Sequence, residues 1–321
     1  MSKAASICLV VGVPPASLAP NGLDGDPVVS FVPLEHASPA QVAAAPVALV
    51  WDFRWQGLGA LLTRAPRLRW VHAGSAGVEH LLPALAARPD IVLTNSTGVF
   101  ERPIAEYVLG LVLRHAKGFG ETAAAQAHRR WAYRETASIE GSTMVVVGAG
   151  RIGTAIARLA AAAGMRVIGV RRRSDGGSAP PFDRIVGIVD LPEVVSEADF
   201  VAVATPATDS TRHLIDARIL RAMRRTAYLV NVGRASAVDT DALVAALHQG
   251  AIAGAALDVF EEEPLPASSP LWTTPNLFVS PHMSGDADNW GRRILELFAT
   301  NLAAWRAGRP LDGVVDRSRG Y

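Results

Sequence analysis

The sequence MVVVGAGRIGTAIA, at residues 144–157, is the strongest indication of the fold class of this chain. An apolar run typical of a buried strand leads directly into three glycines, Gly148, Gly150 and Gly153, and then into a helical pattern. In this arrangement the first glycine permits a tight turn, the second lets the backbone approach a pyrophosphate, and the third lets the helix pack on the strand. The unpaired N–H groups at the start of the helix attract phosphates. We therefore predict a dinucleotide-binding βαβ unit, rather than a glycine turn without a ligand.

A run of arginines follows the next predicted strand. Units of this kind that bind NAD usually carry Asp or Glu there, which accepts hydrogen bonds from the ribose 2′-OH. This chain instead has Arg171, Arg172 and Arg173, followed by Ser174. A guanidinium group binds a 2′-phosphate that a carboxylate would repel. The run predicts a preference for NADP(H), with NAD(H) still possible; the alternative interpretation is a solvated arginine run.

Short apolar runs bounded by Gly, Pro, Asn or Asp recur on both sides of this stretch, with helical segments such as Leu58–Arg64 between them. Strands that alternate with helices indicate parallel sheets of the α/β class. The predicted strands are Ser6–Val11, Val28–Val32, Val47–Trp51, Trp70–Ala73, Ile91–Thr94, Met144–Val147, Val167–Val170, Phe200–Ala204, Tyr228–Val232, Gly254–Leu257 and Leu277–Val279. Helices are predicted over Ile152–Ala163 and Asp288–Arg306. Two such patterns also fit a single duplicated fold.

Composition and charge exclude several classes of protein. With 321 residues the chain exceeds the size of one hydrophobic core, which favours two domains. Half of the residues are hydrophobic, which excludes a disordered chain. The net charge of +1 gives no reason to expect nucleic acid or a membrane surface as a partner. The single cysteine, Cys8, cannot form an internal disulfide or a cysteine-based zinc site, and we predict no metal.

The N-terminus needs separate attention because Lys3 and the apolar run after it imitate a signal peptide. The run is short for the core of a signal peptide, and Gly12, Pro14 and Pro15 close it. We predict a buried strand there and a cytoplasmic protein. No uninterrupted apolar run reaches the roughly 18 residues of a membrane span.

A segment after Pro103, IAEYVLGLVLRHA at residues 104–116, is apolar nearly all round. Proline suits the first turn of a helix, and a helix that is apolar all round is buried on every side. We expect this helix to lie between two domains, between two subunits, or both.

Three further segments complete a set of motifs: NVGRASAVD at residues 231–239, ALDVFEEEPLP at 256–266 and VSPHMSG at 279–285. Together with the glycine stretch they resemble the family of D-isomer-specific 2-hydroxyacid dehydrogenases. The resemblance covers nearly the whole chain, since it extends to WVHAGSAGVEHL at 70–81, TNSTGVFERPIAEYVLG at 94–110 and NLAAWRAGRPLDGVVD at 301–316.

The resemblance implies an α/β fold of two Rossmann-like parallel-sheet domains with an active-site cleft between them. A flavodoxin-like substrate domain would span residues 1–99 and 287–321, and a doubly wound dinucleotide-binding domain residues 100–286. The implied reaction is hydride transfer between NADP(H) and a small 2-keto acid or D-2-hydroxy acid, for example glyoxylate, hydroxypyruvate or a phenylpyruvate-like compound. A homodimer is also implied, with Trp131 in the position of the family's dimer arm.

The resemblance also implies three catalytic residues. Arg234 would hold the substrate carboxylate, since its planar fork matches that group. His282 would be the acid in reduction and the base in oxidation, because histidine side chains titrate near working pH. Glu263 would hydrogen-bond His282 and orient it, and we choose it over Glu261 and Glu262 because it directly precedes Pro264. Taken singly, each residue also fits a solvated surface position.

Further site residues are predicted on the same basis. The loop Ser75, Ala76, Gly77 and Val78 would supply backbone N–H groups to the substrate carboxylate, although an ordinary turn also fits it. The predicted cofactor-binding residues are Gly148, Gly150, Arg151, Ile152, Gly153, Arg171, Arg172, Arg173, Thr205, Pro206, Val232, Gly233, Asp258 and Gly285. Among them, Asp258 and the backbone around Gly285 would orient the nicotinamide amide.

The chain departs from the family pattern after His282, where it reads MSGDADNW. Met283, Ser284 and Trp290 therefore do not point to one substrate. Trp51, Phe53 and Trp55 fit a pocket for a bulkier keto acid or the core equally well. Two other functions stay open: a dinucleotide-sensing interaction protein like the family's corepressors, and an enzyme on another two-domain Rossmann scaffold, such as an alanine dehydrogenase relative.

Overall fold

The computed structural model describes residues 6–12, 29–172 and 177–320. The chain forms two compact units, residues 1–100 with 288–321 and residues 101–287. Each crossing thus lies one residue later than predicted. At the first crossing this follows from packing, because the Phe100 ring lies 6.4 Å from the Trp290 ring, inside the first unit.

The sheet of the first unit is parallel throughout, in the order β2-β1-β3-β4-β5. This is the flavodoxin-like order of a doubly wound sheet. Its strands are β1 (Ser6–Val11), β2 (Val29–Pro33), β3 (Val47–Val50), β4 (Trp70–Ala73) and β5 (Val92–Asn95). All of them lie within two residues of the predicted strands, and Cys8 is buried in β1 as expected.

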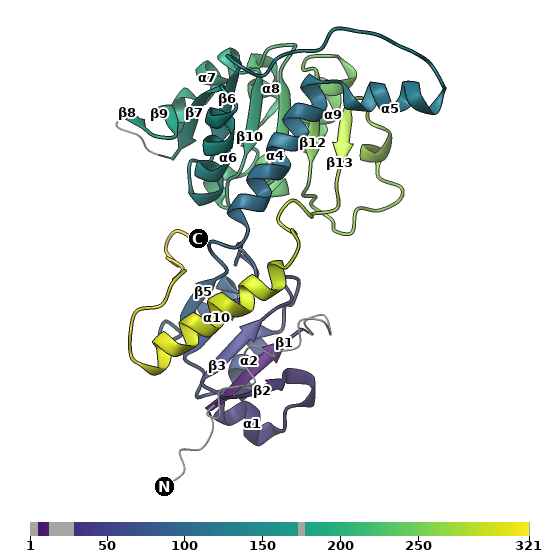
Figure 1. Ribbon diagram of the computed structural model, residues 1–321. Coiled ribbons are helices and arrows are strands. Elements are labelled where there is room, and N and C mark those ends of the chain that lie inside the picture. Colours follow the sequence, from purple (N-terminus) through teal and green to yellow (C-terminus); the bar gives the residue numbers. More distant parts are fainter. Residues whose placement is uncertain (1–5, 13–28, 173–176, 321) are drawn as a thin grey trace. The chain divides into compact units, whose positions relative to one another are not determined.

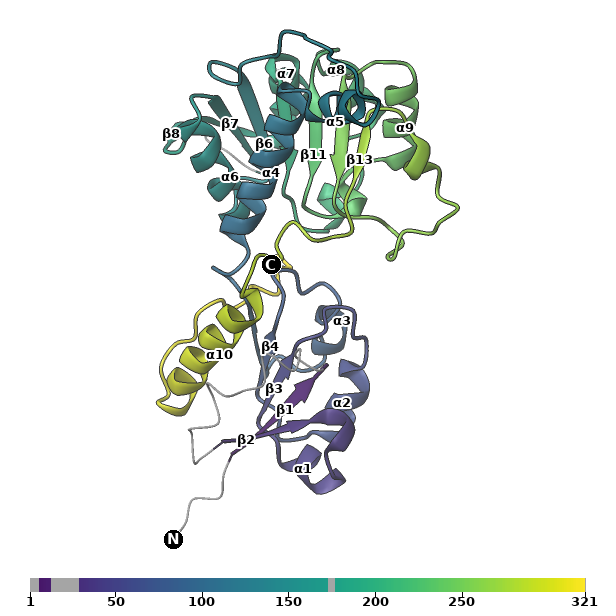
Figure 2. The same ribbon diagram turned by 45° about the vertical axis from the view of Figure 1, so that its right-hand side comes forward.

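Helices cover both faces of this sheet (Figure 2). One face holds α1 (Pro39–Ala44), α2 (Leu58–Arg64) and α3 (Leu82–Leu85), and the other holds α10 (Trp290–Arg306). The fully buried Trp70 ring stacks on Phe298 of α10 at 5.1 Å and on Trp305 at 5.7 Å. The C-terminal helix therefore completes the core of the first unit, which is why this unit is discontinuous in sequence.

The sheet of the second unit runs in the order β13-β12-β11-β10-β6-β7-β9-β8. Every neighbouring pair is parallel except β8 with β9. Counted from β6 it is the doubly wound order 3-2-1-4-5-6, with one more strand at either edge. The strands are β6 (Thr143–Val147), β7 (Arg166–Arg171), β8 (Gly177–Ala179), β9 (Phe182–Gly187), β10 (Phe200–Val203), β11 (Tyr228–Asn231), β12 (Gly254–Leu257) and β13 (Leu277–Val279).

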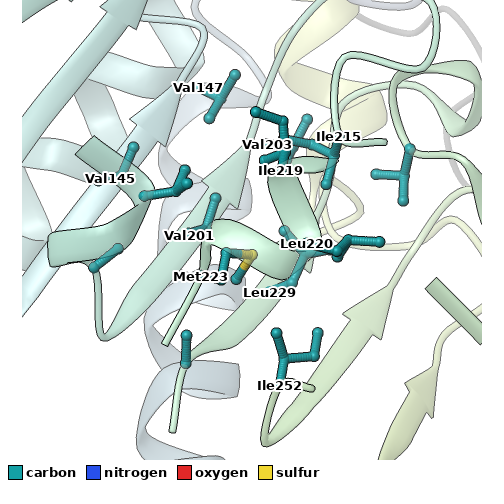
Figure 3. Close-up of a cluster of buried hydrophobic side chains, with 14 of the residues drawn as sticks. Val145, Val147, Val201, Val203, Ile215, Ile219, Leu220, Met223, Leu229 and Ile252 are labelled. Carbon is teal, nitrogen blue, oxygen red and sulfur yellow. The ribbon is translucent and has the colours of Figure 1, made fainter. Parts of the chain in front are cut away.

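Helices again lie on both faces (Figure 1). One face carries α4 (Glu101–Ala116) and α6 (Arg151–Ala162), and the other α7 (Leu191–Glu197), α8 (Ala217–Ala222) and α9 (Thr240–His248). Because side chains alternate across a strand, Val145, Val201 and Leu229 all point to the second face, where they meet Ile219 of α8 and Met223 directly after it (Figure 3). The predicted class, two parallel-sheet α/β domains, is confirmed.

Three elements were not predicted, namely β8, β9 and α5 (Phe119–Ala127). In the single chain one side of α4 is open, so the predicted burial of this helix between two subunits stays a prediction. Arg102, Glu106 and Gly110 are exposed, and their spacing of four residues makes one open stripe along the helix. Within the described residues, no helix is both long and apolar enough to cross a membrane.

Candidate active site

The glycine turn between β6 and α6 has a distinct geometry at each of its three glycines. Gly148 has φ +106°, and a Cβ there would lie 2.7 Å from the Ala204 carbonyl oxygen. At Gly153 a Cβ would overlap the carbonyl oxygen of Gly148. At Gly150, by contrast, no described atom lies within 4 Å of an added Cβ, so the backbone there faces open space. Gly148 and Gly153 thus permit close packing of the backbone, and the backbone at Gly150 is accessible to a ligand.

The loops after β10 and β11 lie against this turn. A Cβ on Gly233 would lie 2.8 Å from both the backbone nitrogen and the carbonyl oxygen of Thr205, so the two backbones touch. Thr205 is 7% exposed, and its hydroxyl has no hydrogen-bond partner among the described residues. An unpaired buried hydroxyl is costly and calls for a partner. An open backbone cradle at a helix start and an unpaired hydroxyl at the switch point of the sheet fit a bound dinucleotide.

The arginines of the predicted 2′-phosphate site follow β7. Val170 accepts hydrogen bonds from the N–H groups of Gly148 and Ala149 at 2.9 and 3.0 Å, so the exposed Arg171 and Arg172 begin beside the glycine turn. Arg173, with Ser174, lies outside the described residues. Both residues follow the strand after which Rossmann units that bind NAD carry an acidic residue.

His282 and Glu263 are joined directly. The Nδ1 atom of His282 lies 2.8 Å from Oε2 of Glu263, and the other carboxylate oxygen accepts the N–H of Phe260 at 3.0 Å. The carboxylate is therefore held by the backbone on one side and holds the imidazole on the other. A carboxylate at Nδ1 keeps the proton on that nitrogen and leaves Nε2 for proton exchange with a substrate. Glu261 and Glu262 are exposed, so the choice of Glu263 as the partner of His282 agrees with this geometry.

Arg234 follows β11, as Glu263 follows β12 and His282 follows β13. Because these strands are parallel neighbours, all three residues lie at one edge of the sheet, the edge of the glycine turn. Asn231 supports the Arg234 loop, since its amide accepts Gly233 N–H and donates to the Arg234 carbonyl oxygen, both at 3.1 Å. Sequence reasoning missed this asparagine, although its place just before the Val-Gly-Arg motif was a usable indication.

Asp258, predicted to face the nicotinamide, is 1% exposed and points toward the segment that carries His282. Its carboxylate accepts the Ser280 hydroxyl at 2.7 Å, Met283 N–H at 3.0 Å and Ser284 N–H at 2.9 Å. Beside this segment an open pocket of about 470 Å³ lies against α4, lined in part by Met283 and Asp286. Burial raises the pKa of the Asp286 carboxyl.

The loop of residues 75–78 belongs to the other unit. Its carbonyl groups are used, because Ser75 O accepts Ser96 N–H at 3.0 Å and Ala76 O accepts the Asn95 side chain at 2.8 Å. The predicted contact of this loop's backbone N–H groups with a carboxylate stays a prediction.

The other predicted residues divide between open and buried positions. Arg151 is exposed and Ile152, Pro206 and Gly285 are half-buried, whereas Val232 is buried. Of the aromatic residues, Trp55 packs against the core of the first unit. Trp51 is buried with its ring 5.4 Å from that of Trp290, and Phe53 is partly exposed under the Arg54 guanidinium. The core interpretation therefore holds for Trp51 and Trp55.

Comparisons with known proteins agree with this geometry. A family model described as the NAD binding domain of D-isomer specific 2-hydroxyacid dehydrogenases matches residues 109–284. A glyoxylate reductase of Aeropyrum pernix is 35% identical over 268 residues, which cover 80% of this chain and 79% of that protein.

Solved structures match over nearly the full length. A D-isomer specific 2-hydroxyacid dehydrogenase family protein from Aeromonas salmonicida has a TM-score of 0.86 and 31% identity, and the match covers 98% of this chain and 100% of that one. An NADPH-dependent glyoxylate/hydroxypyruvate reductase from Sinorhizobium meliloti, solved with NADP and sulfate, has a TM-score of 0.84 and 27% identity, with the same coverage.

Proposed function

The chain belongs to the D-isomer specific 2-hydroxyacid dehydrogenases, oxidoreductases that act on a CH–OH group, and from this premise we propose its reaction: hydride transfer between NADP(H) and a small 2-keto acid or D-2-hydroxy acid. The observation that carries the proposal is the 2.8 Å contact between His282 Nδ1 and Glu263 Oε2, at the sheet edge that also holds the glycine turn.

Reduction adds a hydride to the keto carbon and a proton to the keto oxygen. The reduced nicotinamide supplies the hydride. His282 gives the proton from Nε2, while Glu263 stabilises the imidazolium through Nδ1 and keeps the ring oriented. Arg234 binds the substrate carboxylate and polarises the carbonyl group. In oxidation the proton returns to Nε2.

The cofactor would be held by the open backbone at Gly150, the start of α6 and the Thr205 hydroxyl. We propose NADP(H) over NAD(H), because Arg171 and Arg172 offer guanidinium groups where an acidic residue would select NAD. The Sinorhizobium relative, which its name calls NADPH-dependent, supports the same preference.

We further propose a homodimer, supported by two exposed features of the second unit. Trp131 and Tyr133 are 99% and 88% exposed, and exposed aromatic side chains of this size are typical of contact surfaces. The open stripe of α4 (Arg102, Glu106, Gly110) is the second feature. The molar mass in solution tests this, and a monomeric wild type would overturn it. A cytoplasmic location also stays a prediction, which cell fractionation tests.

The deciding experiment is turnover of NADPH with a panel of 2-keto acids that includes glyoxylate, hydroxypyruvate and phenylpyruvate. We expect turnover with at least one acid, and its near-complete loss in His282→Ala with NADPH binding retained. NADPH binding without turnover across the panel would favour the dinucleotide-sensing alternative. That alternative is not favoured now, since the relatives that match over most of both chains are named as reductases.

A further inference from the structure

The segment that carries His282 is held by a carboxylate that belongs to another strand. Asp258 at the end of β12 accepts three hydrogen bonds, and all three come from residues 280–284. Two of the donors are consecutive backbone N–H groups, those of Met283 and Ser284 directly after the histidine. Hydrogen bonds to a buried carboxylate are among the strong ones, so they set the backbone on the C-terminal side of His282.

The backbone of His282 needs such support. Its φ is +52°, in the left-handed region that non-glycine residues seldom adopt. Residues hold such values only when their surroundings impose them. Here the Ser280 hydroxyl binds Asp258 before the histidine and the Met283 N–H binds it afterwards, so Asp258 spans the strained residue.

The Ser280 hydroxyl leads on to a third element. It donates its hydrogen to Asp258 at 2.7 Å, and Tyr107 of α4 lies beside it, where it lines one pocket with Met283 and Ser284. Burial raises the pKa of the Tyr107 phenol; the neighbouring Ser280 lowers it by less, and the charge of Asp258 adds a smaller rise.

We propose that Tyr107, Ser280 and Asp258 form a positioning chain that fixes the backbone of His282 so that its imidazole meets Glu263. Tyr107 is then a positioning residue, contributed by α4 from outside the strand-end loops. The inference rests on the proposed function and adds to it: it assigns Asp258 a role toward the histidine, separate from any contact with the nicotinamide.

The first test is kinetic, with Tyr107→Phe and Ser280→Ala. We expect each to lower kcat for keto-acid reduction roughly tenfold, because small displacements of a catalytic group are costly, while the Kd for NADPH changes less than about twofold. The isotope effect on kcat with 4-deuterated NADPH should rise in both variants, since proton and hydride transfer become slower. The double variant should be no slower than Ser280→Ala, because both changes break one chain.

The matched control is Tyr228→Phe. Tyr228 is a buried tyrosine of the same unit, its ring stacked on that of His115 at 4.2 Å, and it lies outside the chain of Tyr107, Ser280 and Asp258. It should leave kcat and the isotope effect unchanged. An equal loss in this control, or additive effects of Tyr107→Phe and Ser280→Ala, would overturn the proposal. A raised Kd for NADPH with unchanged kcat would do so as well, because it would place Asp258 and its partners at the cofactor alone.

The second test does not depend on turnover. Hydrogen exchange of the Met283 and Ser284 amides should be about fivefold faster in Tyr107→Phe, Ser280→Ala and Asp258→Asn than in the wild type and in the Tyr228→Phe control. Unchanged exchange would refute the positioning chain. If the wild type reduced no 2-keto acid, the proposed function would fail, and this measurement would still decide whether the chain of hydrogen bonds holds the loop.

Discussion

Replacement of Glu263 by glutamine removes the charge of the carboxylate and almost nothing of its size. In the protein the two oxygens of Glu263 have separate tasks, since one accepts Phe260 N–H at 3.0 Å and the other faces His282 Nδ1 at 2.8 Å. Glutamine has one oxygen and one NH₂ group. If the oxygen keeps Phe260, the NH₂ group faces the Nδ1–H of the imidazolium, donor against donor.

The magnitude follows from the bond that is lost. A hydrogen bond to a charged group contributes about 1.5–3 kcal/mol. Both side chains are partly shielded, with 18% of Glu263 and 33% of His282 exposed, so this range needs little reduction for solvent screening. Since about 1.4 kcal/mol is a factor of ten, we expect Glu263→Gln to lower kcat/KM for reduction about 10- to 100-fold.

The assay is initial-rate reduction of the best 2-keto acid by NADPH, with the Kd for NADPH and the melting temperature measured in parallel. Glu262→Gln is the matched control, because it removes the same charge one residue away at an exposed position. It should keep at least half of the wild-type kcat/KM. Equal losses in the two variants, or a Glu263→Gln enzyme within twofold of wild type, would refute the reasoning.

Three further predictions follow from other parts of the structure. Arg171→Ala combined with Arg172→Ala should lower kcat/KM for NADPH at least about tenfold while that for NADH changes little, because charge-assisted bonds to the 2′-phosphate are lost; equal losses with both cofactors would contradict this. Gly153→Ala should abolish NADPH binding or folding, because its Cβ would overlap the Gly148 carbonyl oxygen, and a normal melting temperature with normal NADPH affinity would speak against it. Burial lowers the pKa of His72 from 6.5 to about 3, so on acidification the histidine binds a proton in the unfolded chain before it does so in the folded protein. Stability is therefore lost as the pH falls below about 6.5, and the free energy of unfolding should drop by up to about 1.4 kcal/mol per pH unit. The slope should be shallower in His72→Gln.

Much of the fold was predictable because it is written in short-range patterns. Strands of four to six apolar residues bounded by turn residues are recognised locally, and β1, β4, β12 and β13 have the predicted bounds. The strands β8 and β9 were missed, since β8 is exposed throughout and β9 has two consecutive charged residues, Asp183 and Arg184, between its buried Phe182 and Ile185. We expected α4 to be buried on every side because Leu109 and Gly110 both count as apolar in the sequence. In the structure Gly110 is exposed and Leu109 is half-buried.

Part of the candidate site was predictable for the same reason. The spacing of the glycines in residues 148–153 predicts the turn between β6 and α6. The order of the motifs predicts that Arg234, Glu263 and His282 each follow a strand. Parallel neighbouring strands then carry their carboxyl ends to one edge, so the sequence by itself determined which loops meet.

Only the tertiary structure decided which atoms meet within those loops. It selects Glu263 from three consecutive acids as the partner of His282, aims Asp258 at residues 280–284, and brings the phenol of Tyr107 to Ser280 across more than 170 residues of sequence. The physical reason is that hydrogen bonds require donor and acceptor within about 3 Å in the right direction. Periodicity and motif spacing predict where backbone segments lie, whereas the packing of α4 against the sheet determines which donor and acceptor atoms come within hydrogen-bond distance.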